Sequence, residues 1–124
     1  MKLSRLIDPK FKATLTQLNS QKLPLKAAFK LKTIIKKIDE EYSKYDEVRL
    51  ASLNRYGKKK DDGSLDTDDQ GNVPLEGDNG QLFVNELNEL LDLDIAIPTL
   101  SVSELGNDIS ISSEELMLLD FLVE

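Results

Sequence analysis

Apolar residues recur every three or four positions between Leu25 and Tyr56. Such spacings place side chains on one side of an α-helix, which has 3.6 residues per turn. Pro24 suits the start of this helix, and neither Gly nor Pro interrupts the run before Gly57. A helix of this length extends about 48 Å at 1.5 Å per residue. Its predicted apolar stripe comprises Ala27, Leu31, Ile34, Ile35, Ile38, Tyr42, Tyr45, Leu53 and Tyr56.

Local signals predict three shorter helices. Asp8 followed by Pro9 is typical of a helix start, and this helix should run to about Leu18. A later helix should run from about 81 to 91. The sequence Ser112-Ser-Glu-Glu115 is a capping box that begins a terminal helix, because the Ser and Glu side chains each accept from a free backbone amide. The apolar sides of these last two helices are Phe83, Val84, Leu87, Leu90 and Leu91, and then Leu116, Leu118, Leu119, Phe121 and Leu122.

The remaining segments read as strands and loop. Residues 94–102 alternate in polarity and predict an extended segment at the edge of a sheet. Pro98 has no backbone N–H, so it is tolerated only where no hydrogen bond to a neighbouring strand is needed. Residues 109–111 predict a second short strand. Residues 57–81 hold five of the six glycines and many acidic residues, so we expect a loop with a turn at 69–72.

The predicted fold class is therefore mainly α with a minor α+β character. A long helix should pack with two or three shorter helices, and one or two short strands should lie near the C-terminal end. We expect a single domain over residues 1–124, made of a basic helical half (1–56), an acidic Gly/Asp-rich loop (57–81) and an acidic helix-strand-helix half (82–124). The expected core or interface residues are Leu31, Ile34, Ile35, Ile38, Tyr42, Tyr45, Leu53, Phe83 and Leu87.

Charge is strongly segregated along the chain. All 16 Lys and Arg lie in residues 1–60, where six acidic residues leave a net charge of +10, and the other 64 residues hold 17 acidic residues and no basic one. The two halves should meet, because pairing relieves the repulsion within each. We expect the helix at 81–91 to pack on the long helix, with Arg49 close to Glu86 or Glu89.

Several kinds of chemistry are disfavoured by the missing residue types. The chain has no His and no Cys, which removes the commonest general base, most nucleophilic triads, disulfides and the common zinc sites. The glycines are scattered and form no phosphate-binding loop. We therefore expect no catalytic residues, no cofactor and no enzymatic activity.

The acidic loop resembles a calcium loop only in part. Asp66, Asp68 and Gly71 occupy positions 1, 3 and 6 of an EF-hand-like loop, but position 5 is Gln70 and position 12 is Gly77. Because these two positions normally supply ligands, we expect no metal site.

The long helix also carries a basic face with Lys26, Lys30 and Lys37, which could follow the phosphates of a nucleic acid. The tyrosines lie on the apolar stripe, and we expect no aromatic residue on the basic face. Nucleic-acid binding is therefore an alternative that the pattern does not favour. Mimicry of nucleic acid by the acidic half is disfavoured as well, because its acidic residues alternate with leucines as in any amphipathic helix.

One family resemblance extends over about residues 20–122. It is carried by residues 22–28 (KLPLKAA), the long charged helix ending at 55–57 (RYG), the loop rich in Asp, Gly and Asn, the segment at 95–97, Leu105-Gly106, and residues 113–120 (SEELMLLD). This pattern resembles a family of small tailed-bacteriophage and prophage proteins that carries only a domain-of-unknown-function label. The resemblance implies phage origin and no particular activity.

The leading hypothesis is a non-enzymatic phage structural or accessory protein that acts through protein-protein contacts, as a homo-oligomer or as part of the virion. One alternative is a phage regulatory protein that binds and inhibits a host enzyme or defence factor, and another is a nucleic-acid-binding accessory protein. No run of 18 apolar residues occurs, so we expect no membrane association. The expected location is the virion or the cytoplasm of the infected bacterial host.

Overall fold

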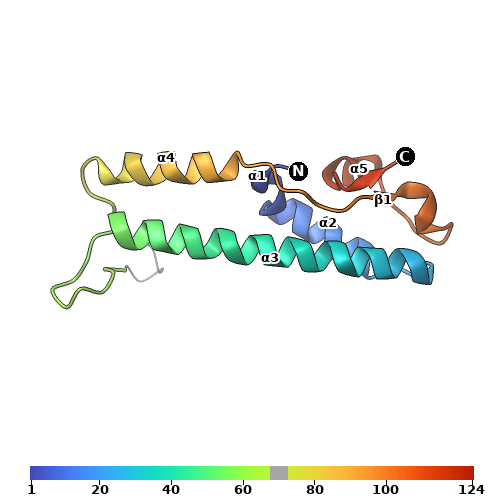
Figure 1. The fold of residues 1–124 in the computed structure, drawn as a ribbon, viewed down its shortest axis with the longest axis horizontal. Coiled ribbons are helices and arrows are strands. Elements are labelled where there is room, and N and C mark those ends of the chain that lie inside the picture. The colour runs from blue at the N-terminus through green and yellow to red at the C-terminus, as the bar shows by residue number, and fades with distance from the viewer. Residues whose placement is uncertain (68–72) are drawn as a thin grey trace. The chain divides into compact units, whose positions relative to one another are not determined.

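The computed structural model describes residues 1–67 and 73–124 (Figure 1). The protein is mainly helical, with the long helix α3 (Leu25–Tyr56) packed against shorter helices and a two-stranded parallel sheet, so the predicted fold class is confirmed. The chain divides into two compact units. Unit 1 comprises residues 1–42 and 93–124, and unit 2 comprises residues 43–92. The single domain expected over residues 1–124 stays a prediction.

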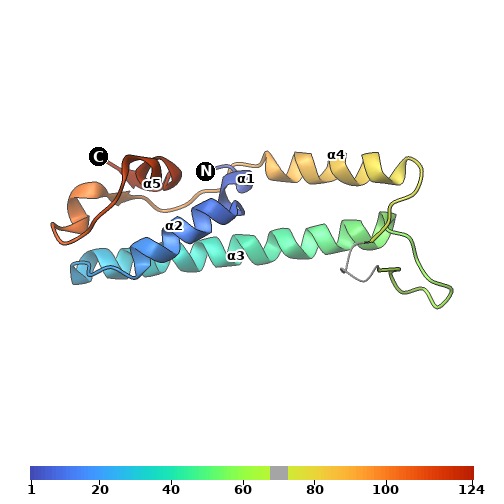
Figure 2. The same ribbon diagram turned by 180° about the vertical axis from the view of Figure 1, so that it is seen from behind.

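Unit 1 contains the first part of α3 and most of the short elements. Asp8 caps α2 by accepting from the backbone N–H of Lys10 at 2.9 Å, as the sequence predicts. In both Figure 1 and Figure 2, α2 runs along the first part of α3. The short elements of unit 1 are α1 (Leu3–Leu6), α2 (Pro9–Asn19), β1 (Leu100–Ser101), the 3-10 helix η1 (Val102–Leu105), α5 (Ser113–Leu118) and β2 (Leu122–Val123).

The core of unit 1 joins both ends of the described chain. Phe11 of α2 and Phe121 meet edge to face, with ring centres 6.4 Å apart and ring planes at 86°. Full burial of a large apolar side chain stabilises a fold by about 1.5–3 kcal/mol. The predicted core residues Leu31, Ile34 and Ile38 are buried here. Around them are buried Leu3, Leu6, Phe11, Leu15, Leu18, Ala27, Leu100, Leu105, Leu119 and Phe121.

The C-terminal end differs from the predicted helix. The capping box is present, with the Glu115 backbone N–H donating to Ser112 Oγ at 3.1 Å, but α5 ends after six residues. Leu119 leaves the helical conformation, with ψ at 78°. Residues 119 and 121 are then both buried, and β2 pairs with β1. An extended segment points every second side chain to the same face, so it can bury both Leu119 and Phe121. Burial of these two side chains stabilises the extended conformation over a longer helix.

The second strand predicted at residues 109–111 is wrong. The Gln21 side chain holds Ser110 by its backbone: Gln21 Nε2 donates to the Ser110 carbonyl at 3.1 Å, and the Ser110 N–H donates to Gln21 Oε1 at 2.8 Å. The N–H and the carbonyl of Ser110 are therefore both used, and neither is left to pair with a neighbouring strand. The second strand is instead β2, and of the predicted extended segment 94–102 only Leu100–Ser101 forms a strand.

Unit 2 contains the end of α3, the loop and α4 (Asn79–Leu91). Gly57 follows α3 where a Cβ would lie 2.7 Å from both the Leu53 carbonyl oxygen and Val73 Cγ1, so only glycine fits. The helix predicted from 81 begins two residues earlier, where Asn79 Nδ2 donates to the Tyr56 carbonyl at 3.2 Å. The turn predicted at 69–72 lies outside the described residues, and an antiparallel bridge joins Lys59 to Leu65.

Candidate interaction surface

The first turns of α3 have two opposite faces. Ala27, Leu31 and Ile34 are buried in unit 1, whereas Leu25 is 88% exposed and Phe29 is 72% exposed. A spacing of four residues places Leu25 and Phe29 side by side, one turn apart. Spacings of three and four then bring exposed lysines to the same side. We call this surface the α3 outer face, and it consists of Leu25, Phe29, Lys32 and Lys36, with Lys26 at its edge.

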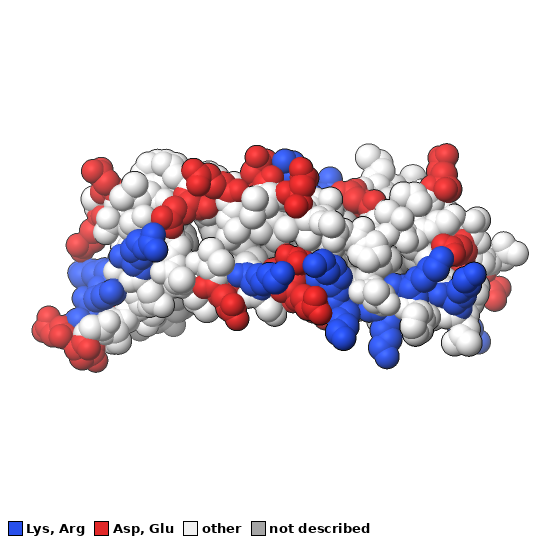
Figure 3. Space-filling view, viewed as in Figure 1, with Lys and Arg blue, Asp and Glu red and all other residues white. Residues whose placement is uncertain are grey.

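Two large apolar side chains of the α3 outer face remain exposed to solvent. Leu25 and Phe29 are adjacent, and neither is drawn into the unit 1 core, because the other side of the helix already fills it. Figure 3 shows Lys and Arg side chains gathered along α3 in the half of the picture where that helix begins. Large apolar side chains with a charged border are typical of protein contact sites.

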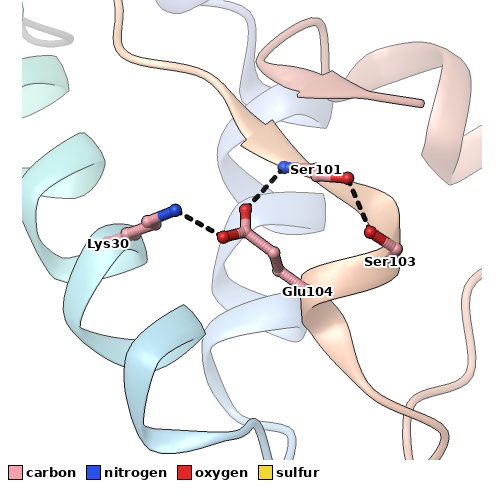
Figure 4. Close-up of polar contacts among 4 residues, drawn as sticks. All are labelled: Lys30, Ser101, Ser103 and Glu104. Atoms are coloured by element: carbon pink, nitrogen blue, oxygen red, sulfur yellow. Dashed lines mark hydrogen bonds and ion pairs between the residues drawn. The ribbon is translucent and has the colours of Figure 1, made fainter.

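The lysines predicted as one basic face divide into two groups. Lys30 forms an ion pair with Glu104, which also accepts from the Ser101 backbone N–H at 3.1 Å and so caps η1 (Figure 4). The hydrogen bond from Lys30 is the main reason why the pKa of Glu104 lies below its ordinary value. Lys37 pairs with Glu41 at 2.9 Å. In the part of the chain that the structure describes, Lys26 forms no ion pair within 4.0 Å.

The expectation that no aromatic residue lies on the basic face is wrong. Phe29 lies on the outer side of α3 between Lys26 and Lys32. The signal was present in the sequence, because Leu25 and Phe29 are four residues apart and fall outside the predicted apolar stripe. The tyrosines alone do not describe the aromatic content of this helix.

Two of the predicted core residues of unit 1 are half-buried. Ile35 lines a pocket of about 220 Å³ between α2 and α3, together with Leu15 and Ile38. Tyr42 is packed under a cation: Lys12 Nζ lies 3.3 Å from the centre of its ring. Such a contact stabilises by about 0.5–1 kcal/mol at an exposed site.

A second pocket, of about 340 Å³, lies at the start of α3. Its walls are residues 22–24 and 105–108. Gly106 has φ at 79° and lies so close to Pro24 that a Cβ would approach within 3.1 Å of the proline Cγ. The charged residues of this pocket are Lys22 and Asp108, both exposed. Pro24 in its wall directly precedes Leu25, the first residue of α3.

In unit 2, Tyr45 is buried, Leu53, Phe83 and Leu87 are half-buried, and no residue of α4 is fully buried. The α3 and α4 segments are tied by polar contacts to one carboxylate. Ser52 Oγ donates to Glu86 at 2.6 Å and Tyr56 Oη at 2.8 Å. These two bonds are the main reason why the pKa of Glu86 lies below its ordinary value.

The ion pair of Arg49, which we expected close to Glu86 or Glu89, is with Asp46. Arg55 Nη1 lies 3.3 Å from Glu86 Oε1, whereas Arg49 pairs with Asp46 at 3.0 Å. Asp46 lies three residues before Arg49 on the same helix, where the two side chains meet without help from α4. Glu89 is exposed.

The expectation that the two charge halves meet is confirmed. Ion pairs join residues 1–60, which hold every Lys and Arg, to the acidic remainder of the chain within each unit. In unit 1 they are Lys2–Asp94 at 4.0 Å, Arg5–Asp120 at 3.6 Å, and Lys30–Glu104, and in unit 2 they are Arg55–Glu86 at 3.3 Å and Lys58–Glu76 at 3.4 Å.

Within residues 1–67 and 73–124, no three side chains of His, Cys, Asp or Glu form a group that could hold a metal ion. No helix among these residues has both the length and the apolar character that a membrane span requires. Comparisons of the chain with protein-family models, with curated proteins and with solved structures gave no match.

Proposed function

We propose that this chain is a non-enzymatic structural or accessory protein that acts through protein-protein contacts made by the α3 outer face. The observation that carries the proposal is the exposure of Leu25 and Phe29 side by side on one turn of helix. Burying such side chains against a partner yields about 25 cal/mol for each Å² of apolar surface removed from water.

The chemistry of the α3 outer face suits a protein partner with acidic groups around an apolar centre. An aromatic side chain that fills a pocket on a partner typically dominates the binding energy of an interface. Lys26, Lys32 and Lys36 would form the charged border, where cations speed association with an acidic surface more than they add affinity. The absence of His and Cys from the sequence supports a role that needs no catalysis.

Nucleic-acid binding is the second candidate, and Phe29 is the observation that favours it. An exposed aromatic ring between Lys26 and Lys32 can stack on a base while the lysines contact phosphates. The neighbouring Leu25 argues for protein, since an exposed leucine offers a nucleic acid neither stacking nor charge. The use of Lys30 and Lys37 in contacts within unit 1 also removes two cations from the face.

The resemblance to small tailed-bacteriophage proteins suggests where the protein acts. It supports a structural or accessory role in a tailed phage, with the virion as the location. A regulatory protein that binds a host enzyme or defence factor would use the same kind of surface in the cytoplasm of the infected host. Mass spectrometry of purified particles distinguishes the two, because only the structural role requires the protein to be present in them.

Site-specific photo-crosslinking tests whether the α3 outer face contacts protein. The photoreactive amino acid p-benzoylphenylalanine is introduced in place of Phe29 in the cells that express the protein. As a matched control, it is introduced in place of Lys10, an exposed residue of α2. We expect protein adducts from position 29 and none from position 10. Adducts that disappear after nuclease treatment would support the second candidate, and the absence of any adduct at position 29 would contradict both.

A further inference from the structure

The acidic half of the chain has an exposed apolar surface of its own, on α5. Met117 is 76% exposed, and Leu116 beside it is also exposed. Glu114 lies three residues before Met117, one turn away on the same side of the helix, and is exposed. We call Glu114 and Met117 the α5 patch; Leu116 lies about 100° further round the helix and is not part of it.

The α5 patch and the α3 outer face complement each other. One combines a methionine with a carboxylate, and the other combines a phenylalanine and a leucine with lysines. Methionine suits such a contact, because its flexible thioether packs well against aromatic rings. Both surfaces belong to unit 1, and both Phe29 and Met117 are exposed there, so neither covers the other within one copy.

We propose that the α3 outer face of one copy binds the α5 patch of a second copy. This inference rests on the proposed function and names the partner of the same surface. Charge complementarity identifies the α5 patch as the partner of the α3 outer face. Every basic residue lies in residues 1–60, so the α5 patch of a second copy brings a carboxylate to the lysines of the α3 outer face. Because two different surfaces meet, the contact either closes as a symmetric dimer, in which each copy uses both surfaces, or continues head to tail along a chain of copies, and the mass of the unchanged protein distinguishes the two.

A head-to-tail contact has a consequence that a symmetric one lacks. Each bound copy still has one free surface of the opposite kind, so copies add until they close into a ring or form a filament. Because the border charges are exposed, association should weaken as salt shortens the range of their attraction, which is about 10 Å at 0.1 M.

Complementation between two variants tests the inference. Phe29→Asp removes the apolar centre of the α3 outer face and leaves the α5 patch intact, and Met117→Asp does the reverse. By light scattering after gel filtration at low salt, the unchanged protein should exceed the 13.9 kDa monomer. Each variant alone should be monomeric, and an equimolar mixture should give a species of twice the monomer mass. Val48→Asp is the matched control, an exposed apolar position of unit 2, and should behave as the unchanged protein.

Folding and charge are checked separately. Circular dichroism must show unchanged melting of both variants, since both positions are exposed; if a variant unfolds, Phe29→Ser or Met117→Ser replaces it. Lys32→Glu or Glu114→Lys alone should weaken association, and the protein carrying both changes should regain it.

Each contrary result has a defined meaning. A monomeric unchanged protein overturns the inference, and so does a mixture of the two variants that does not combine. If photo-crosslinks from position 29 reach another protein and not a second copy, the proposed function stands and the contact between copies falls. If they reach no protein, both fall.

Discussion

The hydroxyl group of Ser52 donates to the Glu86 carboxylate at 2.6 Å and so joins the last turns of α3 to α4. Ser52 is buried, whereas no α4 residue is fully buried, so this bond holds a helix with little apolar anchoring. Ser52→Ala should therefore loosen α4 more than it affects unit 1. Hydrogen exchange should show faster exchange in residues 79–91, and Asn54→Ala, an exposed change on the same helix, should not.

Ile38 and Ile35 offer a matched pair of core substitutions. Ile38 is buried and Ile35 is half-buried beside an open pocket. Ile38→Asp should unfold unit 1, because an unpaired carboxylate would enter apolar surroundings, whereas Ile35→Asp can turn its carboxylate towards water. Equal melting temperatures for the two variants would contradict this. A milder change, Ile34→Ala, should cost about 2–5 kcal/mol of unfolding free energy in urea titrations.

The carboxylate of Glu104 makes stability depend on pH. Its pKa is lower in the folded protein than in the unfolded chain, chiefly because Lys30 donates to it. The contribution is therefore complete above the unfolded pKa, about 4.3 for a glutamate, and is lost as pH falls through the lower folded value. Melting temperatures should drop on acidification in this range, and less so for Glu104→Gln. The same change at Glu47, an exposed position of α3, is the matched control variant.

Gly106 should resist substitution. Its φ of 79° disfavours any residue with a side chain, and a Cβ there would press on Pro24. Gly106→Ala should cost at least about 1 kcal/mol, since the left-handed region is strained for residues other than glycine. Gly63 also has a positive φ but an open surrounding, so Gly63→Ala should cost less, and a denaturant series on both variants checks the difference.

The helices could be predicted because their signals are local. Pro24 and Gly57 limit α3 on both sides, and Ser112 with Glu115 starts α5, each through neighbours within a few residues. The strands could not be predicted in the same way. Leu122 pairs with Leu100, which is 22 positions away, so no short pattern contains both partners. The four-residue helix α1 carries too short a pattern to be recognised.

The candidate surface was partly hidden for a similar reason. The sequence showed the lysines but not which of them are used internally, because Glu104 comes to Lys30 only through the fold. Arg49 is an exception, because its partner Asp46 lies only three residues before it on the same helix and this spacing is local. Phe29 differs, since its position outside the apolar stripe could have been read from the spacing alone.

The order of synthesis differs from the order of assembly in this chain. Unit 1 is built from residues 1–42 and 93–124, with all of unit 2 between them in the sequence. On the ribosome, unit 2 is therefore complete while Phe11 and its neighbours still lack Phe121 and the other residues that bury them. At 5–20 residues per second, the final segment takes roughly 2 to 6 s to follow. During that interval the nascent α2 exposes an apolar side that a chaperone can bind.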